Sequence, residues 1–224
     1  MKGGLAIFVK TPGLSPLKTR LAASIGTTSE SWYRLAIEAV KSVALDSRNT
    51  LGINAYWAVA ETEAMQHPLW QTLPRLQQAD GGLGERMGCV MRMLIRQHGY
   101  GILIGADAPQ ICPLDIQTAS DFLDNSDPRI VLGPARDGGF WCVGSNQSFP
   151  IDLWQSVTYS KPNTYVDFNA AFSPFAEILN LRILTDVDEV TDLAICHREL
   201  EALDNATPEQ RALLEAFSQF ELSA

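Results

Sequence analysis

The sequence predicts an α/β fold in which a mostly parallel sheet is covered by helices on both faces. Two observations support it: short, continuous apolar runs follow one another along the chain, and segments of helical periodicity lie between them. An apolar run without polar alternation is typical of a strand that is buried on both faces. A chain of 224 residues, 46% of them hydrophobic, is also long enough to bury such a sheet.

Seven runs are candidates for strands, most of them bounded by glycine, proline or polar residues. The first follows two glycines, and the fourth, Gly101–Gly105, ends in a small-residue turn. We expect Trp57, in the second run, to pack in the core. In chain order the predicted strands are 5–9, 52–60, 76–78, 101–105, 129–132, 140–143 and 181–184.

Apolar residues three and four positions apart predict the helices that connect these strands. Gly26 ends the first helix, and Pro113 begins the fourth. Three prolines break residues 150–179 into short helical parts. Outside residues 150–179, the predicted helices, with the first and fourth included, are 17–26, 32–45, 87–95, 113–123, 193–203 and 208–220.

The composition restricts the kinds of partner. A net charge of −9 argues against non-specific binding to nucleic acid or to an acidic membrane, so a phosphate ligand needs a local basic cluster or a metal ion. The four cysteines have no zinc-like spacing and are expected to be reduced thiols. No apolar run has membrane-spanning length and no leader pattern is seen, so we expect a soluble, cytoplasmic protein.

A single carboxylate, Asp107, stands in the turn after the fourth predicted strand, with Pro109 behind it. In open α/β sheets, ligands bind just beyond the carboxyl ends of the strands, which is where this side chain is expected. The alternative is that Asp107 caps the next helix.

A basic loop, residues 10–20, lies between the first predicted strand and a helix. It contains Lys10, Lys18, Arg20 and Gly13, in the layout of a phosphate site, although the P-loop and dinucleotide motifs are absent. The three cations can neutralise phosphate oxygens, and backbone amides around Gly13 add donors. The alternative is a solvated loop. We favour phosphate binding because the local charge opposes that of the whole chain.

Two glycine-containing loops can approach a ligand closely. Residues 79–86 lead into the third helix, where Arg86 is expected at the mouth of a nucleotide pocket; a surface ion pair is the alternative. A hairpin turn explains Asp137-Gly138-Gly139. Beside a second carboxylate site, its glycines would instead give room for an acceptor substrate.

A second acidic pair follows the last predicted strand. Asp186 and Asp188 alternate around Val187, so on an extended segment their side chains point to the same side. Two carboxylates so placed suit a hard divalent cation. The alternative is a pair of helix caps.

Five motifs occur in one order along the chain. They are Phe8-Val-Lys10-Thr-Pro-Gly with Lys18-Thr-Arg-Leu21, Leu83-Gly-Glu-Arg-Met87, Gly105-Ala-Asp-Ala-Pro109, Gly133-Pro-Ala-Arg-Asp-Gly-Gly139, and Asp186-Val-Asp188 with Asp192-Leu193. Together they resemble a bacterial family described as GT-A type glycosyltransferases or nucleotide-diphospho-sugar transferases, linked by name to radical-SAM and selenocysteine-domain proteins. More distantly, the chain looks like the 2-phospho-lactate and molybdenum-cofactor guanylyltransferases.

The resemblance implies a three-layer α/β/α sandwich with a Rossmann-like, mostly parallel sheet, the GT-A fold, and a nucleotide in the N-terminal half. By this likeness the 12–20 loop would wrap a di- or triphosphate, and Gln78 would read the base edge. The loop residues concerned are Pro12, Gly13, Lys18, Thr19 and Arg20.

The same resemblance implies a metal and an acceptor site. Mg²⁺ or Mn²⁺ would bind Asp107, with Asp186 or Asp188 as a second ligand, and the turn Asp137-Gly138-Gly139 would face the acceptor. Relatives commonly carry Asp where this chain has Gly82, and Tyr where it has Phe140.

The implied function is that of a metal-dependent glycosyltransferase with a nucleotide-sugar donor. Lys18, Arg20 and a metal ion on Asp107 would stabilise the leaving phosphate, and Asp137 would be the base for an acceptor hydroxyl. Two alternatives stay open. The Asp-Ala-Pro turn favours a nucleotidyltransferase that joins a nucleoside triphosphate to a small phosphorylated acceptor and releases pyrophosphate. The departures from the family pattern suggest the second alternative, a nucleotide-binding protein without catalytic activity.

We expect one domain over residues 1–224, with a nucleotide-binding half at 1–110, an acceptor-side half at 111–204 and a C-terminal helix at 205–224. The expected partners are a nucleotide sugar or nucleoside triphosphate and a small-molecule acceptor. Leu213, Leu214 and Phe217 of the last helix are expected to pack on their own domain.

Overall fold

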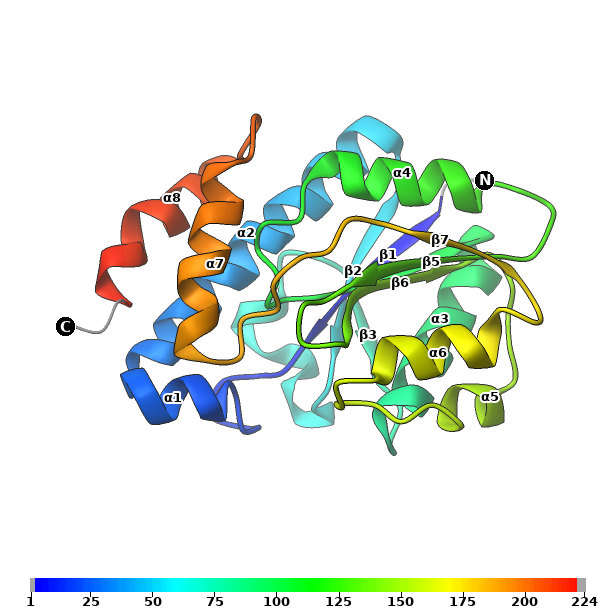
Figure 1. The fold of residues 1–224 in the computed structure, drawn as a ribbon, viewed down its shortest axis with the longest axis horizontal. Coiled ribbons are helices and arrows are strands. Elements are labelled where there is room, and N and C mark those ends of the chain that lie inside the picture. The colour runs from blue at the N-terminus through cyan, green and yellow to red at the C-terminus, as the bar shows by residue number, and fades with distance from the viewer. Residues whose placement is uncertain (1–2, 221–224) are drawn as a thin grey trace.

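A seven-stranded sheet forms the centre of the molecule (Figure 1). The computed structural model describes residues 3–220, so the ends of the predicted domain, 1–2 and 221–224, lie outside the described residues. The strand order is β3-β2-β1-β4-β6-β5-β7, and every neighbouring pair is parallel except the two made by β6. The prediction of a mostly parallel α/β sheet is confirmed.

The strands are short, as expected for a buried sheet. Their bounds are β1 Gly4–Val9, β2 Asn54–Val59, β3 Arg75–Gln77, β4 Gly101–Gly105, β5 Arg129–Pro134, β6 Phe140–Ser145 and β7 Glu177–Asn180.

Helices cover both faces of the sheet. One face carries α1 (Thr19–Ile25), α2 (Thr28–Leu51), α4 (Pro113–Leu123), α7 (Val190–Glu201) and α8 (Pro208–Ala216). The other carries α3 (Leu83–His98), α5 (Ile151–Gln155) and α6 (Thr164–Phe172). Short 3₁₀ turns lie at Thr62–Gln66, Pro68–Trp70 and Phe217–Gln219. Figure 1 shows the two helical layers on either side of the sheet, as the three-layer prediction requires.

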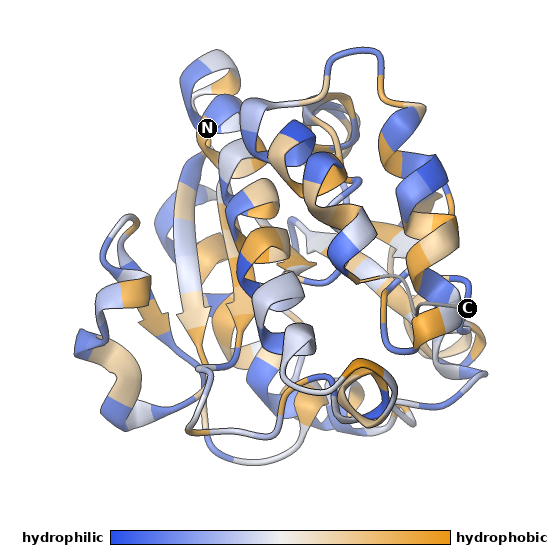
Figure 2. Cartoon of the chain, turned by 90° about the vertical axis from the view of Figure 1, so that its left-hand side faces the viewer, coloured by the Kyte–Doolittle hydropathy of each residue, from blue (hydrophilic) through white to orange (hydrophobic). Residues whose placement is uncertain are grey.

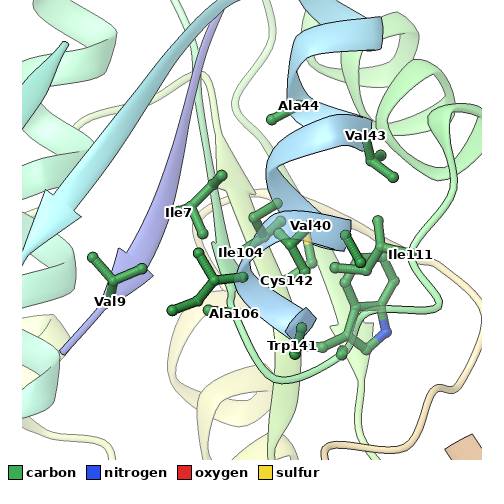
Figure 3. Packing of buried hydrophobic residues seen from close by; sticks show 14 of the residues in the cluster. Ile7, Val9, Val40, Val43, Ala44, Ile104, Ala106, Ile111, Trp141 and Cys142 are labelled. Carbon is green, nitrogen blue, oxygen red and sulfur yellow. The ribbon is translucent and has the colours of Figure 1, made fainter. Parts of the chain in front are cut away.

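The alternation of side chains along β1 supplies both halves of the core. Ile7 and Val9 face α2, whereas Ala6 points to the opposite cluster, as the two-residue period of a strand requires. Figure 3 shows Ile7, Val9 and Ile104 packing beside Val40 of α2. Figure 2 shows that the helices are striped with hydrophobic and hydrophilic residues, so each presents an apolar side to the sheet.

The C-terminal helix α8 packs on α2 of its own domain, as predicted. Leu213 and Phe217 are buried. The Gln210 amide donates hydrogen bonds to the carbonyl oxygens of Pro109 (2.7 Å) and Ile111 (2.8 Å). The last helix therefore braces the turn that follows Asp107.

The predicted last strand, 181–184, is wrong by four residues. Strand β7 pairs with β5 from Arg129–Glu177 to Leu132–Asn180, and beyond it Leu184 makes only an isolated bridge to Ala135. Strand β7 lies at the edge of the sheet and is half-exposed, so it can contain the polar residues Glu177 and Asn180. A continuous apolar run, which predicts a buried strand, therefore does not locate it.

Other elements differ in length rather than in kind. Helices α2 and α3 begin before the apolar periodicity does, at Thr28 and Leu83. Helix α4 is capped by Cys112, so the alternative role of Asp107 as a helix cap is excluded. Among residues 3–220, none of the helices combines the length and apolarity that crossing a membrane requires.

Candidate active site

The chain segments that follow β1, β4, β5 and β7 meet at the carboxyl edge of the sheet. Two contacts join them directly. The Val187 amide donates a hydrogen bond of 3.1 Å to the Asp107 carbonyl, and the Arg136 amide donates one of 3.0 Å to the Leu184 carbonyl. The strand-end location predicted for Asp107 is therefore also the location of Asp186 and Asp188.

Lys18 lies among these three carboxylates. Its Nζ atom is 2.6 Å from Asp107 Oδ2, 2.8 Å from Asp188 Oδ1 and 3.6 Å from Asp186 Oδ1. The Lys18 side chain is only 6% exposed. The basic loop and the acid midway along the chain thus share one rim, as predicted.

The charges in this cluster do not balance. Burial raises the pKa of the Asp186 carboxyl well above its usual range, and the neighbouring Asp107 charge raises it further. For Asp107, burial acts in the same direction, but the charge of Lys18 and its hydrogen bond outweigh it and lower the pKa. Burial opposes the charged form of Lys18, yet the three carboxylates raise its pKa.

The cluster fits a divalent cation. One oxygen from each of Asp107, Asp186 and Asp188 lies within 4.8 Å of the other two, a separation that a single ion can bridge. Asp186 Oδ1 is buried and has no hydrogen-bond partner among the described residues. A carboxylate oxygen left in this state is costly, and a metal ion would satisfy it.

Lys18 is held in a backbone conformation that side chains rarely adopt. Its φ of 40° and ψ of 47° fall in the left-handed region, which costs a non-glycine residue about 1–2 kcal/mol. The conformation directs the residue just before α1 toward the acids. Strain of this kind persists where the surrounding structure fixes it, often at functional sites.

A buried carboxylate that sequence reasoning missed, Glu61, anchors the start of the basic loop. It accepts hydrogen bonds from the Thr11 amide (3.0 and 3.1 Å) and the Thr11 hydroxyl (2.8 Å). Trp70 Nε1 donates to the same hydroxyl. The available signal was position, because Glu61 follows β2 at the carboxyl edge of the sheet.

A first cavity of about 320 Å³ opens at this edge between β1, β4 and the start of α3. Its lining combines apolar side chains of the sheet with three cations, two from the basic loop and one from α3. The cations are Lys10, Lys18 and Arg86, and the acids that reach it are Asp107 and Asp188.

A second cavity of about 240 Å³ adjoins the first. Leu83, Phe140 and Asp188 line both, so the two cavities meet beside the acidic cluster. The remainder of its lining comes from Arg20, the hairpin at Asp137, the loop between α5 and α6, and Asp186.

Four residues predicted to bind the nucleotide or its phosphates line the first cavity: Lys10, Lys18, Gln78 and Arg86. Gln78 is buried, and its amide nitrogen donates to the carbonyl oxygen of Ala58 at 2.8 Å, which leaves its own carbonyl oxygen as an acceptor. Arg86 Nε donates to the Gly81 carbonyl at 2.9 Å.

The rest of the predicted phosphate loop lies elsewhere. Arg20 lines the second cavity, 67% exposed, with its Nη1 atom 3.3 Å from Glu189. Pro12, Gly13 and Thr19 line neither cavity. The helical turn that begins at Thr19 carries Arg20 past the acids, whereas Lys18 points into them.

The Asp137-Gly138-Gly139 hairpin borders the second cavity. Asp137 Oδ1 accepts a hydrogen bond of 2.9 Å from the Gly139 amide. Gly138 has a φ of 87°, and a Cβ atom there would lie 1.8 Å from the Pro162 carbonyl oxygen. Gly138 is therefore required by the turn and by this close approach, and the predicted room for an acceptor lies beside Asp137 and Gly139 instead.

The acids at 186 and 188 are positioned by Asp192, which belongs to the fifth motif but was given no role, and by Glu199, which sequence reasoning did not single out. Asp192 Oδ2, in the first turn of α7, accepts hydrogen bonds from the backbone amides of Asp188 (3.0 Å) and Glu189 (2.8 Å). Glu199 Oε2 accepts from the Thr185 amide at 3.0 Å. The segment is thereby fixed on both sides of Asp186.

Comparison with solved structures places the fold. A protein of Desulfovibrio desulfuricans G20, named for an inferred nucleotide-diphospho-sugar transferase activity, is 24% identical, with a TM-score of 0.82 over 98% of this chain and 97% of that one. CMP:2-keto-3-deoxy-manno-octonic acid synthetase complexed with CTP is 13% identical, with a TM-score of 0.57 over 91% and 100%. A nucleotidyl transferase of Methanothermobacter is 12% identical, with a TM-score of 0.52 over 89% and 99%. These likenesses agree with the predicted fold.

Sequence comparison identifies the family. No curated protein matches the chain. A family model, DUF2064, described as an uncharacterized protein conserved in bacteria, matches residues 44–161, just over half of the chain. The chain belongs to this bacterial family, which agrees with the resemblance drawn from its motifs.

Proposed function

We propose that the protein is a divalent-cation-dependent glycosyltransferase that uses a nucleotide-sugar donor. One observation carries the proposal: two adjoining cavities meet at a cluster of three carboxylates and one buried ammonium group. A transferase needs two substrate sites that converge on one reacting centre. Solved structures of the same fold include transferases that act on nucleotides, which supports the assignment to this class.

The first cavity suits a nucleotide. Its apolar wall, formed by side chains of β1, β4 and β6, can hold a base, and the unengaged carbonyl oxygen of Gln78 can accept a hydrogen bond from the base edge. Lys10, Lys18 and Arg86 can neutralise the phosphates. The Lys18 ammonium would then move its hydrogen bonds from the carboxylates to phosphate oxygens.

Asp107, Asp186 and Asp188 would hold Mg²⁺ or Mn²⁺, which when bound supplies positive charge for the leaving nucleoside diphosphate. Lys18 adds a second cation at the same point. Asp137 borders the second cavity. Gly139 engages its Oδ1 atom, and its other oxygen, which has no hydrogen-bond partner among residues 3–220, can accept the proton of an acceptor hydroxyl.

A second candidate is nucleotidyl transfer, in which an acceptor oxygen attacks the α-phosphorus of a nucleoside triphosphate and pyrophosphate leaves. The Asp107-Ala-Pro turn, with no acid two residues after Asp107, favours it. In this reaction an acceptor phosphate needs in-line placement and no base, so Asp137 has no chemical role.

The test is the identity of the released product. The protein is incubated with nucleotide sugars or nucleoside triphosphates, small acceptors and Mn²⁺, and the product is assayed as nucleoside diphosphate or pyrophosphate. Glycosyl transfer releases the diphosphate, and Asp137→Asn then lowers kcat by about 100-fold or more with donor binding unchanged. Pyrophosphate release, unaffected by Asp137→Asn, establishes the second candidate. Nucleotide binding with neither product indicates a non-catalytic binding protein.

A further inference from the structure

The second cavity carries a pattern of polar groups that transfer to an arbitrary acceptor does not explain. Part of its lining consists of residues that do not line the first cavity, chiefly the loop 159–164 between α5 and α6. Two of the polar side chains in this loop are already engaged. The Tyr159 hydroxyl donates to the Trp154 carbonyl at 2.8 Å, and the Thr164 hydroxyl contacts the Thr158 and Lys161 carbonyl oxygens.

In the loop that carries Lys161, and on Arg20 opposite it, the groups left for a ligand are hydrogen-bond donors or cations, whereas Asp137 adds one carboxylate to the lining. No partner for the Lys161 ammonium or the Ser160 hydroxyl is found among residues 3–220. Arg20, from α1, also lines the cavity. Among the described residues its guanidinium contacts only Glu189, through Nη1, and this ion pair is exposed. An exposed ion pair of this kind is weak, so the guanidinium can turn to a ligand.

The loop that presents Lys161 is fixed. Thr164 is buried, and its hydroxyl also accepts a hydrogen bond of 3.0 Å from the Lys161 amide. Ser160 has a φ of 58°. Ser160 and Lys18 are the two non-glycine residues with positive φ in the described chain, and each lines one of the two adjoining cavities.

Negative charge is concentrated where the two cavities meet, on Asp107, Asp186 and Asp188. Three carboxylates there face one ammonium group, so this end of the second cavity is negative and would repel an anion. An anionic group of a ligand is therefore favoured beside the two cations Lys161 and Arg20, away from the acidic cluster and with Asp137 left to the reacting hydroxyl.

We propose that the second cavity selects an acceptor that bears a phosphate or a carboxylate group, held by Lys161 and Arg20, with its reacting oxygen at the Asp188 end. This proposal rests on the proposed function, because it assigns the substrate class of the acceptor site. Lys161 is then a specificity-determining residue. A cation bound at the acidic cluster would reduce the repulsion and strengthen acceptor binding.

The test uses three probes that share a three-carbon skeleton: glycerol 3-phosphate, D-glycerate and glycerol. Each is titrated by calorimetry into the wild-type protein with Mn²⁺ and whichever nucleoside diphosphate gives the largest thermal shift, and again without Mn²⁺. The same titrations are made with Lys161→Met, Lys161→Arg, Arg20→Met and, as a matched control, Arg92→Met. Arg92 is exposed on α3 and lines neither cavity.

At least one anionic probe is expected to bind about tenfold or more tightly than glycerol, because its contacts are charge-assisted. Lys161→Met and Arg20→Met are each expected to lose most of that preference, Lys161→Arg to keep it, and Arg92→Met to leave it unchanged. Comparison of the two anions identifies phosphate or carboxylate as the preferred group. Nucleotide affinity is expected to stay the same in Lys161→Met.

Equal affinity for glycerol and both anions, no anion binding, or an anion preference that survives Lys161→Met would overturn the proposal. These outcomes differ from failure of the proposed function, which would appear as the absence of a thermal shift with every nucleotide. In that case the anions are titrated with Mn²⁺ alone, and the same comparison of wild type and variants decides on the acceptor site.

Discussion

Two ion-pair clusters lie at the two ends of segment 182–188, and they differ in whether their positive and negative charges are equal in number. Arg182 binds Asp115 through two hydrogen bonds of 2.8 Å and donates a third to the Gln110 carbonyl. Asp115 is buried, and its Oδ2 atom also accepts the Cys112 amide. One cation meets one anion here, and both oxygens of the Asp115 carboxylate accept hydrogen bonds.

At the other end of the segment, Lys18 meets Asp107, Asp186 and Asp188. The buried Asp186 Oδ1 atom lies 3.6 Å from Lys18 Nζ and has no hydrogen-bond partner among the described residues. A structural ion pair is stable when every charge is compensated. Excess carboxylates that are fixed in place instead store electrostatic repulsion, which a bound cation would release. The Arg182–Asp115 pair therefore has the features of a contact that stabilises the fold, and the Lys18 cluster has those of a ligand site.

The largest effect is expected from Asp107→Asn, which removes one charge from the unbalanced cluster while keeping its shape. Mn²⁺-dependent nucleotide binding should weaken by at least the roughly 10- to 100-fold seen when groups around a metal site are changed. The measurement is the nucleotide Kd with and without Mn²⁺, by calorimetry.

The matched control is Asp121→Asn, an exposed acid on α4 outside both cavities. Unchanged nucleotide affinity in Asp107→Asn would remove the basis for a metal-bound donor.

The balanced cluster should respond in the opposite way. Asp115→Asn leaves Arg182 without its anion, and because the Arg182 side chain is 40% exposed we expect a loss of about 2–3 kcal/mol in the free energy of unfolding. Chemical denaturation measures it. The dependence of nucleotide binding on Mn²⁺ should persist, and its disappearance would show that this pair also serves the site.

Lys18→Met tests whether the ammonium occupies the place of a metal. Without its charge, the three carboxylates repel one another, so Mn²⁺ alone should raise the melting temperature more than it does in the wild type. Nucleotide affinity should nevertheless fall about tenfold, because a charge-assisted contact to phosphate is lost. Both quantities come from thermal-shift titrations.

Lys41→Met is the control, since Lys41 is paired with Glu38 on α2. A smaller Mn²⁺ response in Lys18→Met than in Lys41→Met would mean that Lys18 helps to hold the metal rather than competing with it.

The difference between these clusters also explains what the sequence could reveal. Asp107, Asp186 and Asp188 stand shortly after apolar runs, and Lys18 belongs to the loop that follows the first run; parallel strands bring such segments to one edge. Their meeting could be predicted without knowing a single tertiary contact. The fold class follows from the same runs.

Other features depend on pairings that no local pattern specifies. Arg182 and Asp115 are 67 positions apart, and either is ordinary for a surface residue. Strand β7 was misplaced because its bounds are set by the register with β5. Arg20 was assigned to the phosphates with Lys18, but the left-handed backbone at Lys18 and the start of α1 send the two side chains to different cavities.

The smallest effect expected concerns how the unbalanced cluster is held together. Asp192 accepts the amides of Asp188 and Glu189 at the start of α7, so it acts as a cap and fixes the Asp188 backbone. Asp192→Ala should lower the free energy of unfolding by about 1 kcal/mol, the usual cost of a lost cap, and the melting temperature by about 2–4 °C.

If fixed geometry is what stores the repulsion, the same variant should also weaken Mn²⁺ binding a few-fold, because Asp188 can then move away from Asp107 and Asp186. Asn146→Ala, which removes side-chain hydrogen bonds to the backbone of Asn125, Asp127 and Arg129 and lines neither cavity, costs a similar stability and should leave Mn²⁺ binding unchanged. Equal Mn²⁺ affinity in the two variants would mean that the acids converge without the Asp192 cap, held by the Val187–Asp107 backbone contact and by Glu199 on the Thr185 amide.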